Sequence, residues 1–446
     1  MEILAILLFV SIFILILYGY PVAFTLGGLS IIYAFCFLDP TAFAAMPARI
    51  MGVMSNYVLL AVPLFIYMGI MLEKSGLAES LLETMAMLFG RLRGGLAISV
   101  VIVGTLLAAS TGIVGATVIT MGLISLPTML KRGYQPELAT GTIAASGTLG
   151  QIIPPSVVLV LLGSVLNISV GDLFAAAILP GLLLVGCYIL YIGIKAWLQP
   201  ETAPAMPAEE IAAFRSEGFL LKVVEAFVLP LLLIIAVLGS IFSGIASPTE
   251  AAAVGAMGAT ILTILQGKFK LDVLQSVMRE TTFLTCMVFL ILLGATTFSF
   301  VFREMGGDGY LIELIESSQL SPMAFLLLVM VVVFVAGFFI DFIEIIFIIV
   351  PIVAPIFGTY ELSAFSDGFT SSNQLLIWVG VLLALNLQTS FLSPPFGFSL
   401  FYLKGVAPPE ITTGHLYRGI IPFVLIQLVF LIVIILFPEV VFVFID

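Results

Sequence analysis

The chain has 446 residues, of which 62% are hydrophobic and only 9% are charged, and its formal net charge is −11. A soluble domain carries roughly 25% charged residues, so this composition, with a mean hydropathy of +1.29, excludes an ordinary soluble protein. The acidic balance argues against nucleic acid as a partner. The alternating segments of an outer-membrane barrel do not occur in the sequence. We therefore expect an all-α polytopic membrane protein that lies in a lipid bilayer.

Apolar segments long enough, or nearly so, to cross a bilayer as helices recur along the whole chain. The first lies in "MEILAILLFVSIFILILYGYPVAF", which has no basic region before it and no small-residue cleavage site after it. We interpret it as a retained helix and not as a signal peptide. The apolar segments are 3–20, 58–72, 174–190, 227–241, 284–300, 325–340 and 420–437.

The apolar segment at about 96–130 lies between two basic flanks, "GRLRGG" (90–95) and "KRGYQPE" (131–137). Basic flanks favour the cytoplasmic side, so both ends of this segment are expected there. A segment this short that leaves and returns to one side is a re-entrant hairpin. Its tip is expected in the small-residue run "AASTGIVGAT" (108–117).

A broken helix is expected next, at about 138–166, because "GTLGQIIPPSVVLVLLG" (147–163) interrupts an apolar stretch with glycines and a Pro-Pro pair. Proline removes a backbone donor and glycine costs helix stability. Broken backbone at membrane depth persists only where protein covers it or where it lines a cavity, and in transporters such breaks form ion and substrate sites. A structural proline kink is the alternative interpretation, and a second break in an equivalent place argues against it.

A polar, proline-bearing segment at 199–220 divides the chain into residues 1–198 and residues 221–446, and we expect it to be a cytoplasmic linker. Sequence landmarks recur in the same order on both sides of it. "GQIIPPS" (150–156), for example, corresponds to "SFLSPPFG" (390–397). An internal repeat of this kind is typical of secondary transporters.

The second half is expected to contain a hairpin at about 322–357 and a broken helix at about 375–404. The flank after this hairpin, "GTYELSAFSDGFTSSN" (358–373), holds two acidic residues and no Lys or Arg, so the base of the hairpin is expected outside. The two halves are then inverted repeats. Each has about five transmembrane helices, a re-entrant hairpin and a broken helix, and the chain starts and ends outside.

Asp341 and Glu344, in "AGFFIDFIEIIFIIVP", are the only charges in a long apolar stretch. Intramembrane carboxylates are costly, and at positions i and i+3 these two share one helix face. Two interpretations stay open. In the first, the two carboxylates attract a cation, carry a proton or pair with a cation. In the second, they only cap the helix at a solvated hairpin tip. Glu250, in "SPTE", is interpreted as part of a helix capping box.

Other reactive residue types carry weaker signals. Cys36, Cys187 and Cys286 have no metal-binding spacing and are interpreted as packing residues, and His415 as an ordinary interfacial residue. No Walker-type glycine loop occurs, and no cluster of His, Cys or acids suggests an enzyme. Lys404 is the basic residue just after the second broken helix. A carboxylate substrate would have to be bound by Lys404, by hydroxyl groups or by helix N-termini.

Several motifs, in order, resemble the large membrane subunit of tripartite ATP-independent periplasmic (TRAP) transporters. They are "GYQPELATGTIAASGTLGQIIPPS", "SVGDLFAAAILPGLL", "SPTEAAAVGA" and "NLQTSFLSPPFGFSLFYLKGVAP", and the resemblance covers essentially the whole chain. It implies a multi-pass protein of the bacterial inner membrane that takes up a small organic acid by an elevator mechanism driven by sodium. Sodium ions are then the coupling ions, with no other cofactor. The implied partners are a small four-helix membrane subunit and a periplasmic substrate-binding protein.

The resemblance also implies site residues at the two hairpin tips and the two broken helices. Many relatives carry an Asp just after the first tip, where this sequence has Thr117, which weakens a carboxylate ligand there. Substrate binding is implied for Ser110, Thr111, Thr148, Ser156, Asn386, Thr389 and Ser393. Sodium binding is implied for Ser110, Gly112, Gly147, Gly150, Gly337, Asp341, Ser390 and Gly397, and a charge role for Asp341, Glu344 and Lys404.

The main alternative function is a stand-alone elevator carrier for dicarboxylates, coupled to sodium or protons and working without a binding protein. An ATP-driven permease subunit would leave the inverted halves and the broken helices unexplained. The sequence does not name the substrate.

Overall fold

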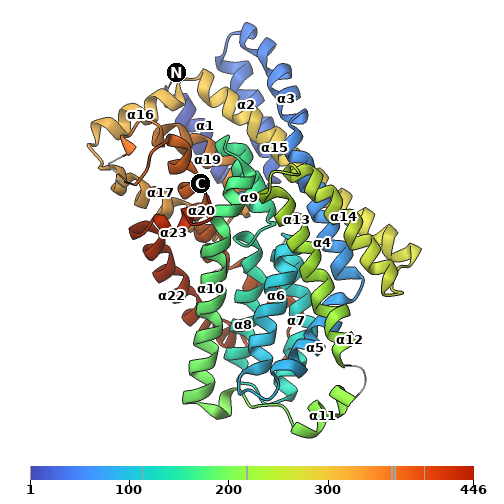
Figure 1. Cartoon of the computed structure of the whole chain (residues 1–446). Helices are drawn as coiled ribbons and strands as arrows, with labels where there is room; N and C mark the ends of the chain where they lie inside the picture. Colours follow the sequence, from blue (N-terminus) through green and yellow to red (C-terminus); the bar gives the residue numbers. More distant parts are fainter. Residues whose placement is uncertain are drawn as a thin grey trace.

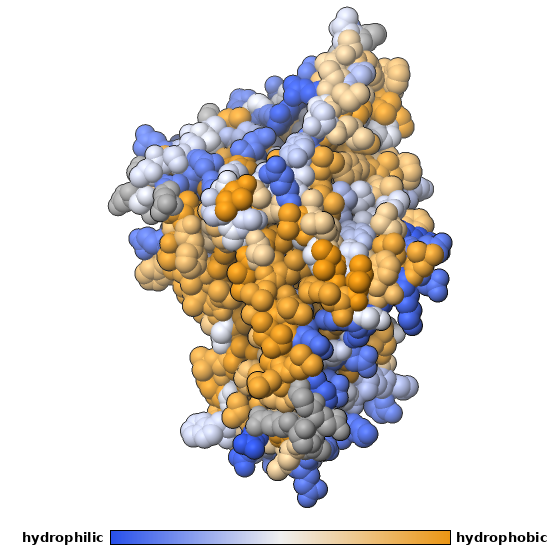
Figure 2. All heavy atoms as spheres, turned by 45° about the vertical axis from the view of Figure 1, so that its right-hand side comes forward, coloured by the Kyte–Doolittle hydropathy of each residue, from blue (hydrophilic) through white to orange (hydrophobic). Residues whose placement is uncertain are grey.

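The computed structural model describes residues 2–112, 114–216, 219–362, 365, 368–395 and 397–445, and the regular elements among them are helices. Eight of the described helices are long and apolar enough to cross a membrane. Many large apolar side chains are exposed, and Figure 2 shows them gathered over the middle of one face, with hydrophilic residues mainly toward its ends. The expected all-helical polytopic fold is thus confirmed.

One group of helices, which we call the scaffold, packs on the long helix α15 and on α4, which lies against it (Figure 1). Helices α2 and α15 pack closely because Gly294 of α15 has no side chain at their contact. A Cβ on Gly294 would lie 2.5 Å from the carbonyl oxygen of Ala23 on α2. The scaffold consists of α1 (Glu2–Leu17), α2 (Val22–Phe37), α3 (Met46–Met54), α4 (Ala61–Lys74), α13 (Leu229–Phe242), α14 (Pro248–Leu265) and α15 (Leu271–Glu304).

A second group of helices, which we call the central bundle, surrounds α8 and α20, whose residues are buried along most of their length. Gly141 and Gly419 bring α8 and α22 together, since a Cβ on Gly141 would lie 2.1 Å from the carbonyl oxygen of Gly419. The bundle consists of α6 (Gly95–Thr111), α7 (Val114–Lys131), α8 (Pro136–Thr148), α9 (Val157–Leu166), α10 (Val170–Leu198), α17 (Pro322–Ala336), α18 (Phe342–Ile348), α19 (Val350–Phe357), α20 (Ser372–Leu392), α21 (Phe398–Val406) and α22 (Thr413–Leu436).

Two short helices connect the scaffold to the bundle. Helix α5 (Leu77–Phe89) leads from α4 to α6, and α16 (Gly307–Ser317) leads from α15 to α17. One side of α5 is apolar and buried, through residues such as Leu81 and Met85. We call α5 and α16 the connecting arms.

The remaining elements are short. Helices α11 (Ala208–Ser216) and α12 (Phe219–Val223) and the π-turn at Val224–Val228 lie between α10 and α13, in and just after the predicted linker. The others are the 3-10 turns Pro40–Ala45, Tyr57–Leu60, Leu149–Gln151 and Pro200–Thr202, and α23 (Glu439–Phe442).

The elements follow one another in the same order in the two halves of the chain. In each half a scaffold helix leads to an arm, then to a helical pair, then to two half-helices separated by a Pro-Pro turn, and then to a long helix. The inverted relation of the two halves, and the boundaries 1–198, 199–220 and 221–446, stay predictions.

The predicted capping box of Glu250 is present and explains this residue structurally. The Ser247 hydroxyl accepts from the amide of Glu250, and the Glu250 carboxylate accepts from the amide of Ser247 at 2.8 Å. His415 has a similar role at the start of α22, where its ring accepts from the amide of Thr412. Both residues therefore satisfy amide groups that a helix N-terminus leaves unpaired.

Candidate functional site

The first helix break separates α8 from α9. Helix α8 ends at Thr148, a 3-10 turn follows, and the Pro154–Pro155 peptide is cis. The hydroxyl of Ser156 donates to the carbonyl of Gln151 at 3.0 Å and caps α9. One side chain therefore serves both ends of the break, which lies buried inside the bundle.

The second break, between α20 and α21, has the same kind of support. The Pro394–Pro395 peptide is cis, and Gly397 takes a positive φ of 45° before α21 begins. The Ser399 hydroxyl donates to the carbonyl of Phe391 at 3.0 Å, across the break. The Tyr417 hydroxyl of α22 donates to the carbonyl of Pro395 at 2.7 Å.

The tip between α6 and α7, hairpin 1, touches the first break through glycines. A Cβ on Gly150 would lie 2.3 Å from the carbonyl oxygen of Ala108, and one on Gly112 would lie 2.8 Å from Val157. Gly147 packs in the same way on Val118 of α7. The hairpin tip and the break are thus in direct contact, with the carbonyl of Ala108 against Gly150, where the sequence predicts a sodium site.

The polar residues of this first tip face one another. The hydroxyls of Thr111 and Thr117 lie 2.8 Å apart, so Thr117, at the position where an Asp is common in the family it resembles, faces the tip. The side chain of Ser110 lies outside the described residues.

The tip between α17 and α18, hairpin 2, touches the end of α20. A Cβ on Gly337 would lie 2.1 Å from the Ser390 hydroxyl oxygen, so only glycine allows this approach. The Asn386 amide of α20 donates to the carbonyl of Met330 on α17 at 2.7 Å. The predicted residues Gly337, Asn386 and Ser390 therefore meet at one place.

Tyr402 joins the second broken helix to hairpin 1. It lies on α21, where a Cβ on Gly115 of hairpin 1 would lie 3.0 Å from its ring. Helix α21 also contacts α7 of this hairpin. The first hairpin and the second broken helix therefore meet at a residue for which the sequence gives no signal.

Asp341 and Glu344 form a capping box at the start of α18. The Asp341 carboxylate accepts from the amide of Phe342 at 2.8 Å, and Glu344 accepts from the amide of Asp341 at 3.2 Å. The capping interpretation is therefore confirmed, while a role of the same carboxylates in ion binding stays a prediction.

Lys404 has a hydrogen-bond partner near its own helix. It is exposed on α21, and its ammonium group donates to the carbonyl of Ile411 in the following loop. An ammonium group has three N–H donors, so this bond leaves two of them, and the predicted charge role of Lys404 stays a prediction.

Four hydroxyl groups near the ends of α8 and α20 share one orientation: each donates its proton to a carbonyl of its own helix or of the helix that it ends. A hydroxyl has a single proton, so these oxygens face their surroundings as acceptors. Acceptors suit a hard cation and not an anion. The donors and their acceptor carbonyls are Thr148 to Ala145, Thr389 to Leu385, Ser390 to Leu387 and Ser393 to Thr389, at 2.7–2.9 Å.

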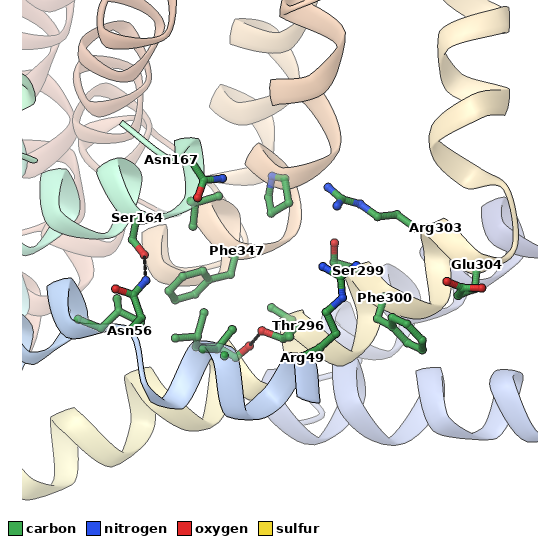
Figure 3. Close-up of a pocket in the computed structure, with 17 residues that line it drawn as sticks. Arg49, Asn56, Ser164, Asn167, Thr296, Ser299, Phe300, Arg303, Glu304 and Phe347 are labelled. Atoms are coloured by element: carbon green, nitrogen blue, oxygen red, sulfur yellow. Dashed lines mark hydrogen bonds between the residues drawn. The ribbon is translucent and has the colours of Figure 1, made fainter. Parts of the chain in front are cut away.

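Two further features escaped the sequence analysis. Gln151, inside the first break, is fully buried, and its amide nitrogen and oxygen find no hydrogen-bond partner among the described residues. A cavity of about 280 Å³ between the scaffold and the bundle is lined by Arg49 and Arg303 (Figure 3). Gln151 stands within the quoted break motif, but nothing in the sequence places the two arginines together.

The described residues contain no group of three or more His, Cys, Asp or Glu side chains that would hold a metal ion. Any cation here would bind to carbonyls, hydroxyls and at most one or two carboxylates, which is a ligand set for a weakly held hard ion.

A shell of apolar helices around two buried helix breaks, each touched by a hairpin tip, defines a multi-pass membrane protein built for transport. Residues 9–440 match the family described as "Tripartite ATP-independent periplasmic transporter, DctM component", and the chain belongs to this family. The expected family is thus confirmed, and the chain is a TRAP large permease subunit of the bacterial inner membrane, not an enzyme.

Individual relatives agree with this assignment. The "C4-dicarboxylate TRAP transporter large permease protein DctM" of Pseudomonas aeruginosa is 32% identical over 414 residues, which cover 93% of this chain and 92% of that protein. The "Sialic acid TRAP transporter large permease protein SiaM" of Vibrio cholerae is 29% identical over 423 residues, covering 94% and 93%. The "Ectoine TRAP transporter large permease protein TeaC" of Halomonas elongata is 27% identical over 428 residues, covering 96% and 95%.

Among solved structures, the YdaH transporter of Alcanivorax borkumensis has a TM-score of 0.61 and covers 89% of both chains. Its sequence identity is 15%, so the likeness concerns the fold alone.

Proposed function

We propose that this permease imports a small organic acid together with sodium ions, and that the central bundle moves as an elevator past the scaffold. The relatives that carry C4-dicarboxylates and sialic acid in their names support an organic acid as the cargo. The proposed partners are a small four-helix membrane subunit and a periplasmic substrate-binding protein that delivers the acid.

The observation that carries the proposal is the pairing of each hairpin tip with a helix break. At hairpin 1 the contact runs through Gly112 and Gly150, and at hairpin 2 through Gly337 and Ser390. These contacts gather backbone carbonyls and acceptor hydroxyls at two places. Such oxygens replace the hydration shell of a hard cation without binding it permanently, as a coupling ion requires.

The orientation in the membrane follows from the basic residues. The base of hairpin 1 carries Arg91, Arg93, Lys131 and Arg132. By the positive-inside rule this side is proposed to face the cytoplasm. The opposite side, which holds the N-terminal end of α1 and the end of α15, then faces the periplasm (Figure 1).

Movement of the bundle is supported by the kind of contacts that cross its boundary with the scaffold. The Asn56 amide donates to the Ser164 hydroxyl at 3.1 Å, and the Thr120 hydroxyl of hairpin 1 donates to the Glu73 carboxylate of α4. A few polar contacts of this kind can break and form again as the bundle moves, while the arms α5 and α16 keep the two parts connected.

The test is uptake into proteoliposomes. The chain is reconstituted with its small subunit and binding protein, and a labelled organic acid that the binding protein holds is supplied with an inward sodium gradient. The proposal predicts uptake that needs both sodium and the binding protein. Equal sodium-driven uptake without the binding protein would assign the chain to stand-alone carriers, and uptake indifferent to sodium would contradict the ion sites.

A further inference from the structure

The cavity lined by Arg49 and Arg303 lies where the scaffold meets the bundle. Helices α3 and α15 of the scaffold form one wall, and the end of α9 with α18 and α19 forms the other. In Figure 3 the two arginines come from different scaffold helices and extend toward the same opening, with Phe347 and Asn167 across from them. Its volume of about 280 Å³ suits a small molecule.

The arginines bring unused donors to this cavity. Arg49 is exposed and makes no ion pair or hydrogen bond with any described residue. The Nε of Arg303 is paired with Asp308 at 3.0 Å, which leaves the outer nitrogens of its guanidinium without a described partner. Glu304 lies at the edge of the cavity, to one side of the arginines (Figure 3). An arginine fork binds a carboxylate through two parallel hydrogen bonds.

The position of these arginines departs from the charge pattern of the chain. The chain has fifteen Lys and Arg residues. Apart from Arg49 and Arg303, they lie on the linker or just after it, at the base of hairpin 1, or within or next to the first or last third of a helix. The two exceptions lie on the opposite side from the base of hairpin 1 and converge on one cavity. Exposed charges on their side include the acidic residues Glu2 and Glu250.

In the structure the hydroxyls of the helix breaks donate to helix carbonyls, so they do not present free donors to an anion. Lys404 is exposed, and one of its three N–H groups is bound to the carbonyl of Ile411. We propose that the cavity between α3, α15 and hairpin 2 is a capture site for the carboxylate of the transported acid, with Arg49 and Arg303 as its ligands. This proposal rests on the proposed function for the direction of transport and names the first site that the acid meets.

The geometry connects this capture site to the predicted core. Phe347 lines the cavity, and it stands six residues after Asp341 at the tip of hairpin 2, which is about 9 Å along a helix axis. The Asn56–Ser164 hydrogen bond joins scaffold and bundle at the wall of the same cavity. An acid held here lies beside α18 of hairpin 2, at the boundary that an elevator movement must shift.

The first test measures the electrostatic potential in the cavity through the rate of thiol modification, and it does not require transport. Ser299, half-buried in the cavity wall, is changed to Cys in a chain whose Cys36, Cys187 and Cys286 are Ser. The thiol is then modified in the assembled transporter with an anionic sulfonate-bearing methanethiosulfonate and, separately, with a neutral one. R49Q is expected to lower the anionic rate about tenfold and to leave the neutral rate unchanged. R418Q, an exposed arginine on the opposite side, serves as the matched control and changes neither rate.

Succinate is the probe in the same experiment. It is expected to slow modification of the Ser299→Cys thiol in the otherwise unchanged protein, and R49Q and R303Q are expected to remove this protection. An anionic-to-neutral rate ratio that R49Q and R303Q leave unchanged, or an absence of protection by succinate, would overturn the proposal. A changed neutral rate in R49Q would point to altered folding, and R49K, which keeps the charge, then decides: it restores the anionic rate if the proposal holds.

The second test is uptake kinetics. R49Q and R303Q are expected to raise KM about tenfold at nearly unchanged maximal rate, because each removes one charged hydrogen-bond donor from the capture step. An unchanged KM would overturn the capture role. Weaker association with the binding protein, at an unchanged anionic modification rate, would assign the arginines to protein docking and also overturn the proposal. If the wild-type chain transports no acid at all, the proposed function fails, and the thiol modification still decides whether the cavity binds a carboxylate.

Discussion

Single residues decide how closely the hairpins approach the helix breaks. Gly337 and Gly150 both stand where a Cβ has no room, but the obstacles differ: a side-chain hydroxyl faces Gly337, and a backbone carbonyl faces Gly150. A side chain can be removed by mutation and a carbonyl cannot. The contact at hairpin 2 can therefore be tested by a paired substitution.

We predict that G337A lowers the free energy of unfolding by about 1–3 kcal/mol through overpacking and strongly reduces uptake. S390G in the same chain should restore much of both, because it removes the Oγ and Cβ that a Cβ at position 337 would meet. Thermal unfolding in detergent and uptake assays measure the two effects. G186A is the control, since a Cβ there meets nothing within 4 Å; loss in G337A without any recovery in the double variant would contradict this contact.

Gln151 carries an unpaired amide inside the first break, and leaving a buried polar group unpaired costs about 1–3 kcal/mol. Q151M, which keeps the length of the side chain, should therefore stabilise the protein in the absence of sodium. If the amide faces a bound ion, the same substitution should also reduce the thermal stabilisation that sodium gives. The measurement is the melting temperature with sodium and with potassium. A Q151M protein that melts lower in potassium would contradict this view of the amide.

At the scale of elements, the ends of the helices are determined by local motifs that can be recognised in the sequence. The Ser-Pro-Thr-Glu motif at 247–250 and the Asp341–Glu344 pair both form capping boxes. Prolines and glycines stand where α8 and α20 end, and small residues stand at the tip of hairpin 1. These features depend on residues within one or two turns of each other, so the sequence predicts them.

Asp341 has both a capping role and a predicted ion-binding role, and asparagine separates them. Asn is as good an N-cap as Asp, but its amide carries no charge. D341N should therefore keep the stability of α18, whereas D341A should lose about 1 kcal/mol. If Asp341 is also a sodium ligand, D341N should raise the sodium concentration needed for half-maximal uptake. Wild-type sodium dependence in D341N would restrict Asp341 to capping.

At the scale of the whole molecule, what matters is which segments distant in sequence meet, and here the sequence was less informative. Tyr402 of the second broken helix faces Gly115 of hairpin 1, although the two residues stand in different halves of the chain. Arg49 and Arg303 reach one cavity from α3 and α15. Nothing near these residues in the sequence identifies their partners, because the packing of scaffold against bundle brings them together.

The central claim is that the bundle moves past the scaffold, and a reversible cross-link tests it most directly. Asn56 and Ser164 lie on the two sides of the boundary, and the Asn56 Nδ2 lies 3.1 Å from the Ser164 Oγ. N56C with S164C, in a chain without its three native cysteines, is therefore the pair to oxidise to a disulfide. The measurement is sodium-driven uptake into proteoliposomes before and after reduction, with each single variant as a control. The account predicts that the oxidised double variant does not transport and that reduction restores uptake. Equal uptake by the oxidised, cross-linked protein would contradict a moving bundle.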